Sequence, residues 1–278
     1  MSNARELKFE SPTFLQRLKG MLGVDFYRLF HTPLFYIFLV IAAIIPAMIL
    51  GMTGMENAEG VVERMYTNTW QIIAADKPVY GFEGIEKYAN MNMVSIFGGI
   101  MVSIFIGHDY KSGYVKQIFT THAKKQDYML SKTVVCAFSM ACMCITYLLG
   151  GVVAGALTKT SFEVNVGSLI FAVLGKMVMS LGWASLYTFL NIIFRRYFGI
   201  SIASSFFFGT GILVIGIGML VGSSVTPVAL NVFLYGSSVY ACLSSTPLTL
   251  LICLATSVAW TAVYNVLGTW ILYRSDVY

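Results

Sequence analysis

Long apolar runs separated by short polar segments dominate the pattern of this chain. Runs of roughly 20 apolar residues, the length that crosses a membrane as a helix, recur along the sequence. They predict six transmembrane helices, at 34–52, 91–107, 133–157, 166–193, 200–222 and 248–272. A transmembrane β-barrel would instead show alternating segments of about 10 residues. We therefore expect an all-α integral membrane protein with a single transmembrane domain over 1–278.

Composition supports a lipid environment. Hydrophobic residues make up 57% of the chain and charged residues 11%, with a mean hydropathy of +0.75. Soluble domains carry about 25% charged residues, so this chain has too few to cover its surface in water. The cysteines form no CxxC pair, and we interpret them as small apolar residues of the helices, at Cys136, Cys142, Cys144, Cys242 and Cys253.

Hydroxyl-proline pairs mark expected helix starts, because Ser or Thr caps a helix and proline fits its first position. Ser11-Pro12, Thr32-Pro33, Thr226-Pro227 and Thr246-Pro247 predict starts near 12, 33, 227 and 247. Pro46, inside the first span, predicts a kink.

The segment 12–31 is predicted to be an amphipathic helix in the membrane interface. Its apolar stripe is interrupted by Lys19 and Asp25 and comprises Phe14, Leu15, Leu18, Met21, Leu22, Phe26, Leu29 and Phe30. A soluble helix packed on a partner is the alternative, but direct continuation into a span at Thr32-Pro33 favours the membrane surface.

Lys and Arg residues set the expected orientation through the positive-inside rule. Four basic residues fall on one side of the predicted spans, and thirteen of the 18 fall on the other: Arg5, Lys8, Arg17, Lys19, Arg28, Lys111, Lys116, Lys124, Lys125, Lys132, Arg195, Arg196 and Arg274. Both termini are therefore expected in the cytoplasm. On the outer side we expect a loop at 53–90 and an uncharged apolar connection at 223–247. Because apolar residues should not face water, this connection is predicted to hold a re-entrant or surface helix.

Catalytic signals are lacking in the sequence. The chain contains no GxxxxGK[ST] phosphate loop and no HExxH or GxSxG motif, and none of its three histidines, His31, His108 and His122, pairs at metal-ligand spacing. No acidic residue falls within the six predicted spans. We expect no catalytic site, no metal, no cofactor and no nucleic-acid partner.

The charged stretch 108–132 is the largest inner loop. Its composition fits either a solvated basic loop that fixes topology or a short amphipathic helix near Gly113 to Thr121. The run from Asp109 to Lys132 resembles the first inner loop of ABC transporter permeases of the type-2 exporter class. Four positions fall in register with that family's pattern: Asp109, Gly113, Lys116 and Lys132. Three depart from it, with Tyr114 in place of Thr, His122 in place of Pro and Lys125 in place of Arg.

The resemblance implies a permease whose inner loop, the coupling helix, docks on a separate ATPase subunit that binds ATP and Mg. The residues implied in coupling are Asp109, Gly113, Tyr114, Lys116, Ile118, Phe119 and Lys125. The implied assembly holds a second permease copy or a paralogue, in the plasma membrane of a bacterium.

Lys176 is the one basic residue expected inside a span. It lies about ten residues into the fourth span, roughly 15 Å deep, where a charge is costly unless it faces the bundle or a wet cavity. It is either a cargo-path cation that meets an acidic group or a lysine that extends outward to the interface.

Together these features predict the permease subunit of an ATP-driven exporter, whose apolar interior suits a hydrophobic or amphipathic peptide or drug. The alternatives are an ATP-independent secondary transporter or channel, expected to carry a carboxylate within the membrane, and a membrane sensor or anchor subunit.

Overall fold

A computed structural model describes residues 12–52, 54–56, 62–64, 69, 93–120, 123–163, 166–211, 232–243 and 246–274 of the chain. Its helices are α1 (Phe14–His31), α2 (Pro33–Met52), α5 (Met93–Lys111), α6 (Tyr114–Thr120), α7 (Lys125–Thr158), α8 (Val166–Ile193), α9 (Phe198–Gly209), α12 (Leu234–Leu243) and α13 (Pro247–Arg274). The strands β1 (Gly54–Glu56) and β2 (Val62–Arg64) pair antiparallel, with Gly54 opposite Arg64.

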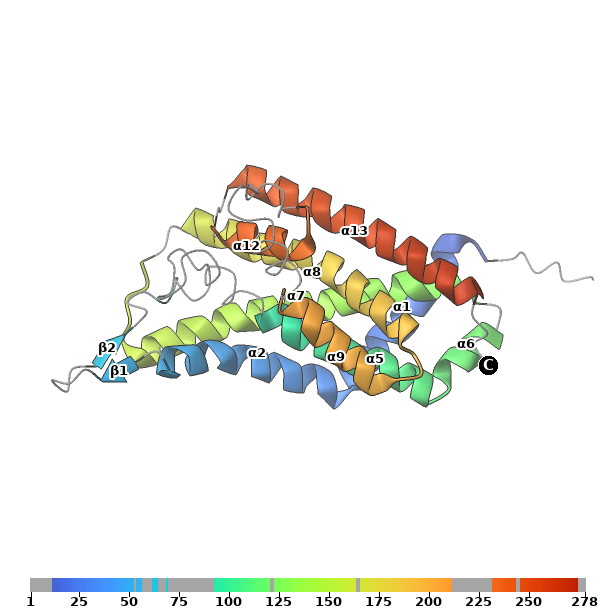
Figure 1. The fold of residues 1–278 in the computed structure, drawn as a ribbon, viewed down its shortest axis with the longest axis horizontal. Helices are drawn as coiled ribbons and strands as arrows, with labels where there is room; N and C mark the ends of the chain where they lie inside the picture. The colour runs from blue at the N-terminus through green and yellow to red at the C-terminus, as the bar shows by residue number, and fades with distance from the viewer. Residues whose placement is uncertain are drawn as a thin grey trace, which may run out of the picture.

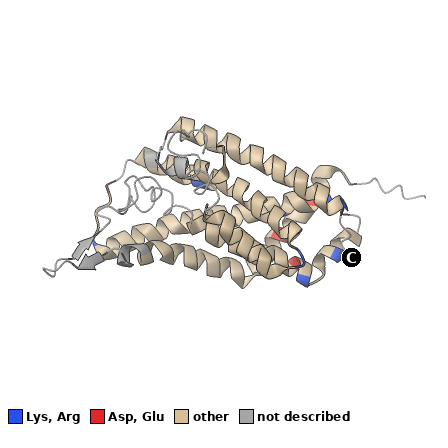
Figure 2. Cartoon of the chain, viewed as in Figure 1, with Lys and Arg blue, Asp and Glu red and all other residues tan. Residues whose placement is uncertain are grey.

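The long helices form an elongated bundle (Figure 1). α1, α6 and the C-terminal end of α13 gather at one end of the bundle, and the β1–β2 hairpin lies at the other. Most of the described Lys, Arg, Asp and Glu residues also lie at the end that carries α1 and α6 (Figure 2). This clustering agrees with the uneven distribution of basic residues along the sequence.

Within the described part of the chain, four helices are long and apolar enough to cross a membrane: α5, α7, α8 and α13. A fifth candidate is the pair α1 and α2, taken together, which is bent by 64° at the break between them. The helical, membrane-type architecture is thus confirmed, whereas the count of six spans stays a prediction. α9 has only 12 described helical residues, about 18 Å of rise.

Two of the expected helix starts are confirmed, because α2 begins at Pro33 and α13 at Pro247. α1 begins at Phe14, two residues after the expected start near 12, because Thr13 caps it through a reciprocal bond pair with Gln16. The start near 227 lies outside the described residues, and the kink at Pro46 stays a prediction.

Two helix ends near the expected spans have physical causes. α7 begins at Lys125, eight residues before the expected span at 133, because its first charged residues find partners in the bundle. α9 ends at Gly209, where the chain turns at Gly211, whose φ is +70°, and the remainder of the expected span, 212–222, lies outside the described residues. A side chain at Gly211 would collide with the ring of Tyr235 at the start of α12, so only glycine fits there.

The segments expected outside the membrane are described in part. At 53–90 the structure describes β1, β2 and Thr69, whose amide donates to the Ser161 carbonyl over 3.0 Å. Of 223–247, it describes α12 and its flanks. Leu234 and Tyr235 are buried, and α12 packs on α8 and α13, so this part of the connection enters the bundle.

Glycine permits the closest approach between α2 and α7. A Cβ atom at Gly150 would lie 2.0 Å from the carbonyl oxygen of Ala43, and small residues commonly mediate such backbone contacts in membranes. Gly20 and Gly23 on α1, in contrast, have no atom within 4 Å of an added Cβ.

We predict that Gly150→Ala separates α2 from α7 and lowers the free energy of unfolding by about 1–3 kcal/mol, as overpacking does. Gly20→Ala is the matched control, and we expect it to leave stability unchanged or raise it slightly, because alanine favours helix. Thermal unfolding in detergent measures both variants. Equal melting temperatures for the two would contradict the packing described.

Candidate functional site

α6 is a short helix held between the ends of two long ones. Gly113, at φ +74°, makes the turn out of α5, and its amide donates to the Tyr110 carbonyl over 3.3 Å. Val115 faces inward and is buried, whereas Lys116 and Gln117 are exposed. α6 therefore has one face fixed on the bundle and one face open.

Beneath α6 lies a buried lysine between two buried carboxylates. Lys132 of α7 places its Nζ 2.6 Å from Asp25 Oδ1 and 2.6 Å from Asp109 Oδ2. All three side chains have an exposed fraction of 0%. Because Asp25 belongs to α1 and Asp109 to α5, the ammonium joins three helices at one point.

Arg28 of α1 completes this ion cluster of Asp25, Arg28, Asp109 and Lys132. Its Nη2 donates to Asp109 Oδ1, and its Nη1 lies 3.8 Å from Asp25 Oδ1. Two bases meet two acids, so the formal charges of the cluster cancel. This matters because an unpaired charge costs several kcal/mol when it is taken out of water.

Neutral side chains complete the surroundings of the carboxylates. The Ser131 hydroxyl donates to Asp25 Oδ2 over 2.7 Å, and the hydroxyl of the buried Tyr128 lies 3.5 Å from Asp109 Oδ2. The lysine also faces aromatic rings, with Nζ 4.9–5.4 Å from the ring centroids of Phe105, Tyr114 and Tyr128. Ring faces attract cations, so these side chains favour the charged form of Lys132.

Tyr114 connects α6 to the ion cluster. The guanidinium carbon of Arg28 lies 3.9 Å from the centroid of the Tyr114 ring. The last turn of α6 is held by Phe119, whose ring packs edge-on against that of Tyr128, with 5.5 Å between the ring centroids. The position of α6 is thus linked to the spanning helices through aromatic and ionic contacts rather than through the chain alone.

A second ion pair lies beside the cluster. Arg17 Nε donates to Asp127 Oδ2 over 2.9 Å and so ties the first turns of α1 to the start of α7. Lys125 Nζ donates to the Leu272 carbonyl over 2.6 Å, which ties the start of α7 to the end of α13. These contacts extend the fixed part of this bundle end to α13.

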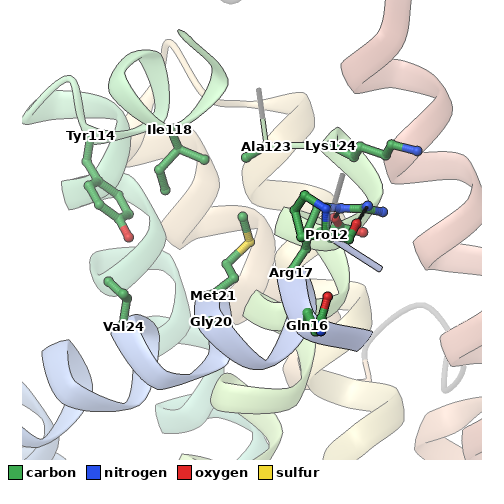
Figure 3. Close-up of a pocket in the computed structure, with 11 residues that line it drawn as sticks. Pro12, Gln16, Arg17, Gly20, Met21, Val24, Tyr114, Ile118, Ala123 and Lys124 are labelled. Carbon is green, nitrogen blue, oxygen red and sulfur yellow. Dashed lines mark hydrogen bonds and ion pairs between the residues drawn. The ribbon is translucent and has the colours of Figure 1, made fainter. Parts of the chain in front are cut away.

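A groove of about 770 Å³ lies between α1 and α6. Figure 3 shows Met21 and Val24 rising from α1 toward Tyr114 and Ile118, which point down from α6. The Arg17–Asp127 pair lines the same groove. Its walls are therefore mainly apolar, with one ion pair among them.

The structure brings the seven residues implied in coupling to this one end of the bundle but gives them different surroundings. Lys116 is exposed; Tyr114, Ile118, Phe119 and Lys125 are half-buried; Gly113 forms the turn before α6. Asp109 is fully buried and bonded to Arg28 and Lys132. Asp109 therefore holds the spans together here rather than facing outward.

Lys176 lies elsewhere, on α8. It is half-buried, with Nζ 5.4 Å from the Tyr147 ring centroid of α7. Its ammonium therefore lies near an aromatic ring of the neighbouring helix. Its role in a cargo path stays a prediction.

A second polar cluster lies inside the bundle, where α5, α8 and α9 meet. Asn191 Nδ2 donates to Ser103 Oγ over 3.1 Å, and the hydroxyls of Ser103 and Ser205 lie 2.8 Å apart. Ser201 donates to Asn191 Oδ1. The interior is therefore less uniformly apolar than its composition indicates.

Sequence reasoning missed Asp25, Arg28 and Lys132 as members of one site. The signal for Asp25 was its position: a carboxylate that interrupts the apolar stripe of α1 needs a buried cation. Nothing in the local sequence identified Lys132 as that cation, because the two residues are more than 100 positions apart.

A scan of the chain against protein-family models found no match, and a search of curated proteins found none either. Among the described residues, no group of three or more His, Cys, Asp or Glu side chains is placed to hold a metal ion.

We predict that Lys132→Met lowers the free energy of unfolding by about 3–5 kcal/mol, the cost of leaving a buried charge without its partner. Lys124→Met, at an exposed position just before α7, is the control and should stay within about 0.5 kcal/mol of the wild type. Denaturant unfolding in detergent micelles measures both. A similar, small change in the two variants would contradict the burial of Lys132.

Proposed function

We propose that this chain is the membrane-spanning permease subunit of an ATP-driven exporter. α6 is the coupling helix that a separate ATPase subunit grips, and the chain forms the translocation path together with a second permease copy or a paralogue. The termini and α6 face the cytoplasm, in the plasma membrane of a bacterium. ATP and Mg are bound by the partner.

One observation carries this proposal: α6 has an exposed face and an inner face linked to the spans. Lys116 and Gln117 are open to a partner, while Tyr114 on the same short helix lies on Arg28 of the ion cluster. A displacement of α6 by a partner therefore moves charged groups that join α1, α5 and α7. This is the connection that an external motor requires to move packed helices.

The buried carboxylates bear on the alternative of an ion-coupled secondary transporter. Such a protein uses a carboxylate within the membrane to carry its ion. Asp25 and Asp109 are buried, but each is already bonded to Lys132, and Asp109 also to Arg28. Asp109 also lies in the last turn of α5, at the end of the bundle that carries α1 and α6 (Figure 1), rather than at its middle. This arrangement supports a joint between helices over an ion carrier.

The cargo we propose is hydrophobic or amphipathic, such as a peptide or a lipophilic drug. The long helices present apolar side chains, and the described polar groups inside them are mostly bonded to one another, as in the cluster around Asn191. Lys176 supplies a cation along the path for an acidic group of the cargo.

We predict that Lys116→Glu weakens binding of the ATPase subunit about tenfold or more, equivalent to about 1.4 kcal/mol, because it reverses a charge on the open face of α6. Lys19→Glu is the matched control, an identical change at an exposed position of α1. Copurification of the chain with the coexpressed ATPase subunit, and ATPase activity of the complex, measure the effect. Full copurification of Lys116→Glu would contradict the docking assignment.

We predict that Lys176→Met lowers ATP-driven export of an acidic amphipathic peptide about tenfold, or roughly 1.4 kcal/mol, and affects a neutral peptide much less. The ammonium is lost while the length of the side chain is kept. Uptake of fluorescent peptides into inverted vesicles measures both rates. Equal export of the two peptides by variant and wild type would remove Lys176 from the path.

A further inference from the structure

Arg28 lies between the carboxylates of Asp109 and Asp25 but forms a hydrogen bond with only Asp109. Its Nη2 donates to Asp109 Oδ1. Its Nη1 is buried without a hydrogen-bond partner in the described part of the chain, and lies 3.8 Å from Asp25 Oδ1. A charge-assisted hydrogen bond needs about 2.8 Å, so a shift of about 1 Å would complete the second contact.

The two contacts have different mechanical consequences. When Arg28 bonds to Asp109, it ties α1 to α5, because the two residues belong to different helices. When it bonds to Asp25, the bond lies within α1, three residues along the same helix. An exchange from Asp109 to Asp25 therefore removes one of the two ionic links between α1 and α5, while Lys132 keeps the other.

The exchange keeps every charge paired. Lys132 contacts both carboxylates, so neither Asp25 nor Asp109 is left without a cation in either arrangement. The planar guanidinium is suited to this role, because it presents several donors in a fixed fork and stacks on aromatic rings. The centroid of the Tyr114 ring lies 3.9 Å from the guanidinium carbon, close enough for α6 to follow the guanidinium or to move it.

We propose that Arg28 is a positioning residue that alternates between Asp109 and Asp25 and so converts the position of α6 into a tighter or looser link between α1 and α5. This inference rests on the proposed function for its purpose, since a partner ATPase supplies the force on α6. The exchange itself belongs to the chain alone and is measurable without that partner.

The experiment measures the separation of α1 and α6 in the purified full chain, in lipid nanodiscs and without any ATPase. Spin labels are attached through a ketone-bearing amino acid at the exposed positions of Lys19 and Lys116, which leaves the native cysteines in place. Pulsed electron resonance then gives the distribution of distances. We expect two separations, one for each partner of Arg28.

Two arginines of α1 provide a matched comparison. Arg28 and Arg17 are exposed to 23% and 22%, and each is bonded to a buried aspartate. Arg28→Lys should change the ratio of the two separations about fivefold or more, a usual size for a coupling between two states, because lysine lacks the planar fork of donors that lets the guanidinium keep its place on the Tyr114 ring while it changes carboxylate. Arg17→Lys should leave the ratio unchanged. Equal distributions in the two variants would overturn the proposal.

A second pair of variants leaves the charges untouched. Tyr114→Leu removes the ring that lies on Arg28 and should shift the ratio as Arg28→Lys does. Tyr114→Phe keeps the ring and loses only the hydroxyl, which also interacts with the guanidinium, so it should shift the ratio much less. Identical behaviour of Phe and Leu at position 114 would also overturn the proposal. If the exchange of Arg28 is not observed, the prediction that Lys116 contributes to ATPase docking still stands. If docking is not observed, the two separations of α1 and α6 are still expected. The two proposals are therefore tested independently.

Discussion

A buried ammonium placed between two buried carboxylates is the constraint on which this end of the molecule depends. Lys132 is 2.6 Å from both Asp25 and Asp109, and none of the three side chains reaches solvent. Ions in such surroundings are tolerated only when paired and hydrogen-bonded, so the three helices that carry them must meet at this point. The amphipathic helix α1 is thereby joined to α5 and α7.

The same contacts explain how a helix as short as α6 holds a defined position. Seven residues do not form a stable helix in isolation, so α6 needs contacts with its neighbours. Tyr114 on Arg28 and Phe119 on Tyr128 supply the missing contacts. The exposed face with Lys116 is consequently presented on a firm support, which is what docking of a partner requires.

The hydrophobic pattern predicted the long helices well because lipid imposes both their length and their apolar character. α8 matches its predicted range, and α2 and α13 begin at the prolines that mark them. The ion cluster could not be predicted in the same way, because its members are brought together by packing over separations of more than 100 residues. Only Asp25, a carboxylate within an apolar stripe, indicated that a buried partner had to exist. The start of α1 was misplaced because Ser11-Pro12 and Thr13 are competing caps, and the capping box with Gln16 selects the second.

The central claim is that the spans move only when a separate ATPase acts on α6. The most direct test reconstitutes the chain in liposomes that hold a self-quenching amphipathic peptide, with and without the proposed ATPase subunit. We predict ATP-dependent peptide movement with both subunits and none with the chain alone. Peptide movement by the isolated chain, at a rate that ATP and the second subunit leave unchanged, would contradict the account.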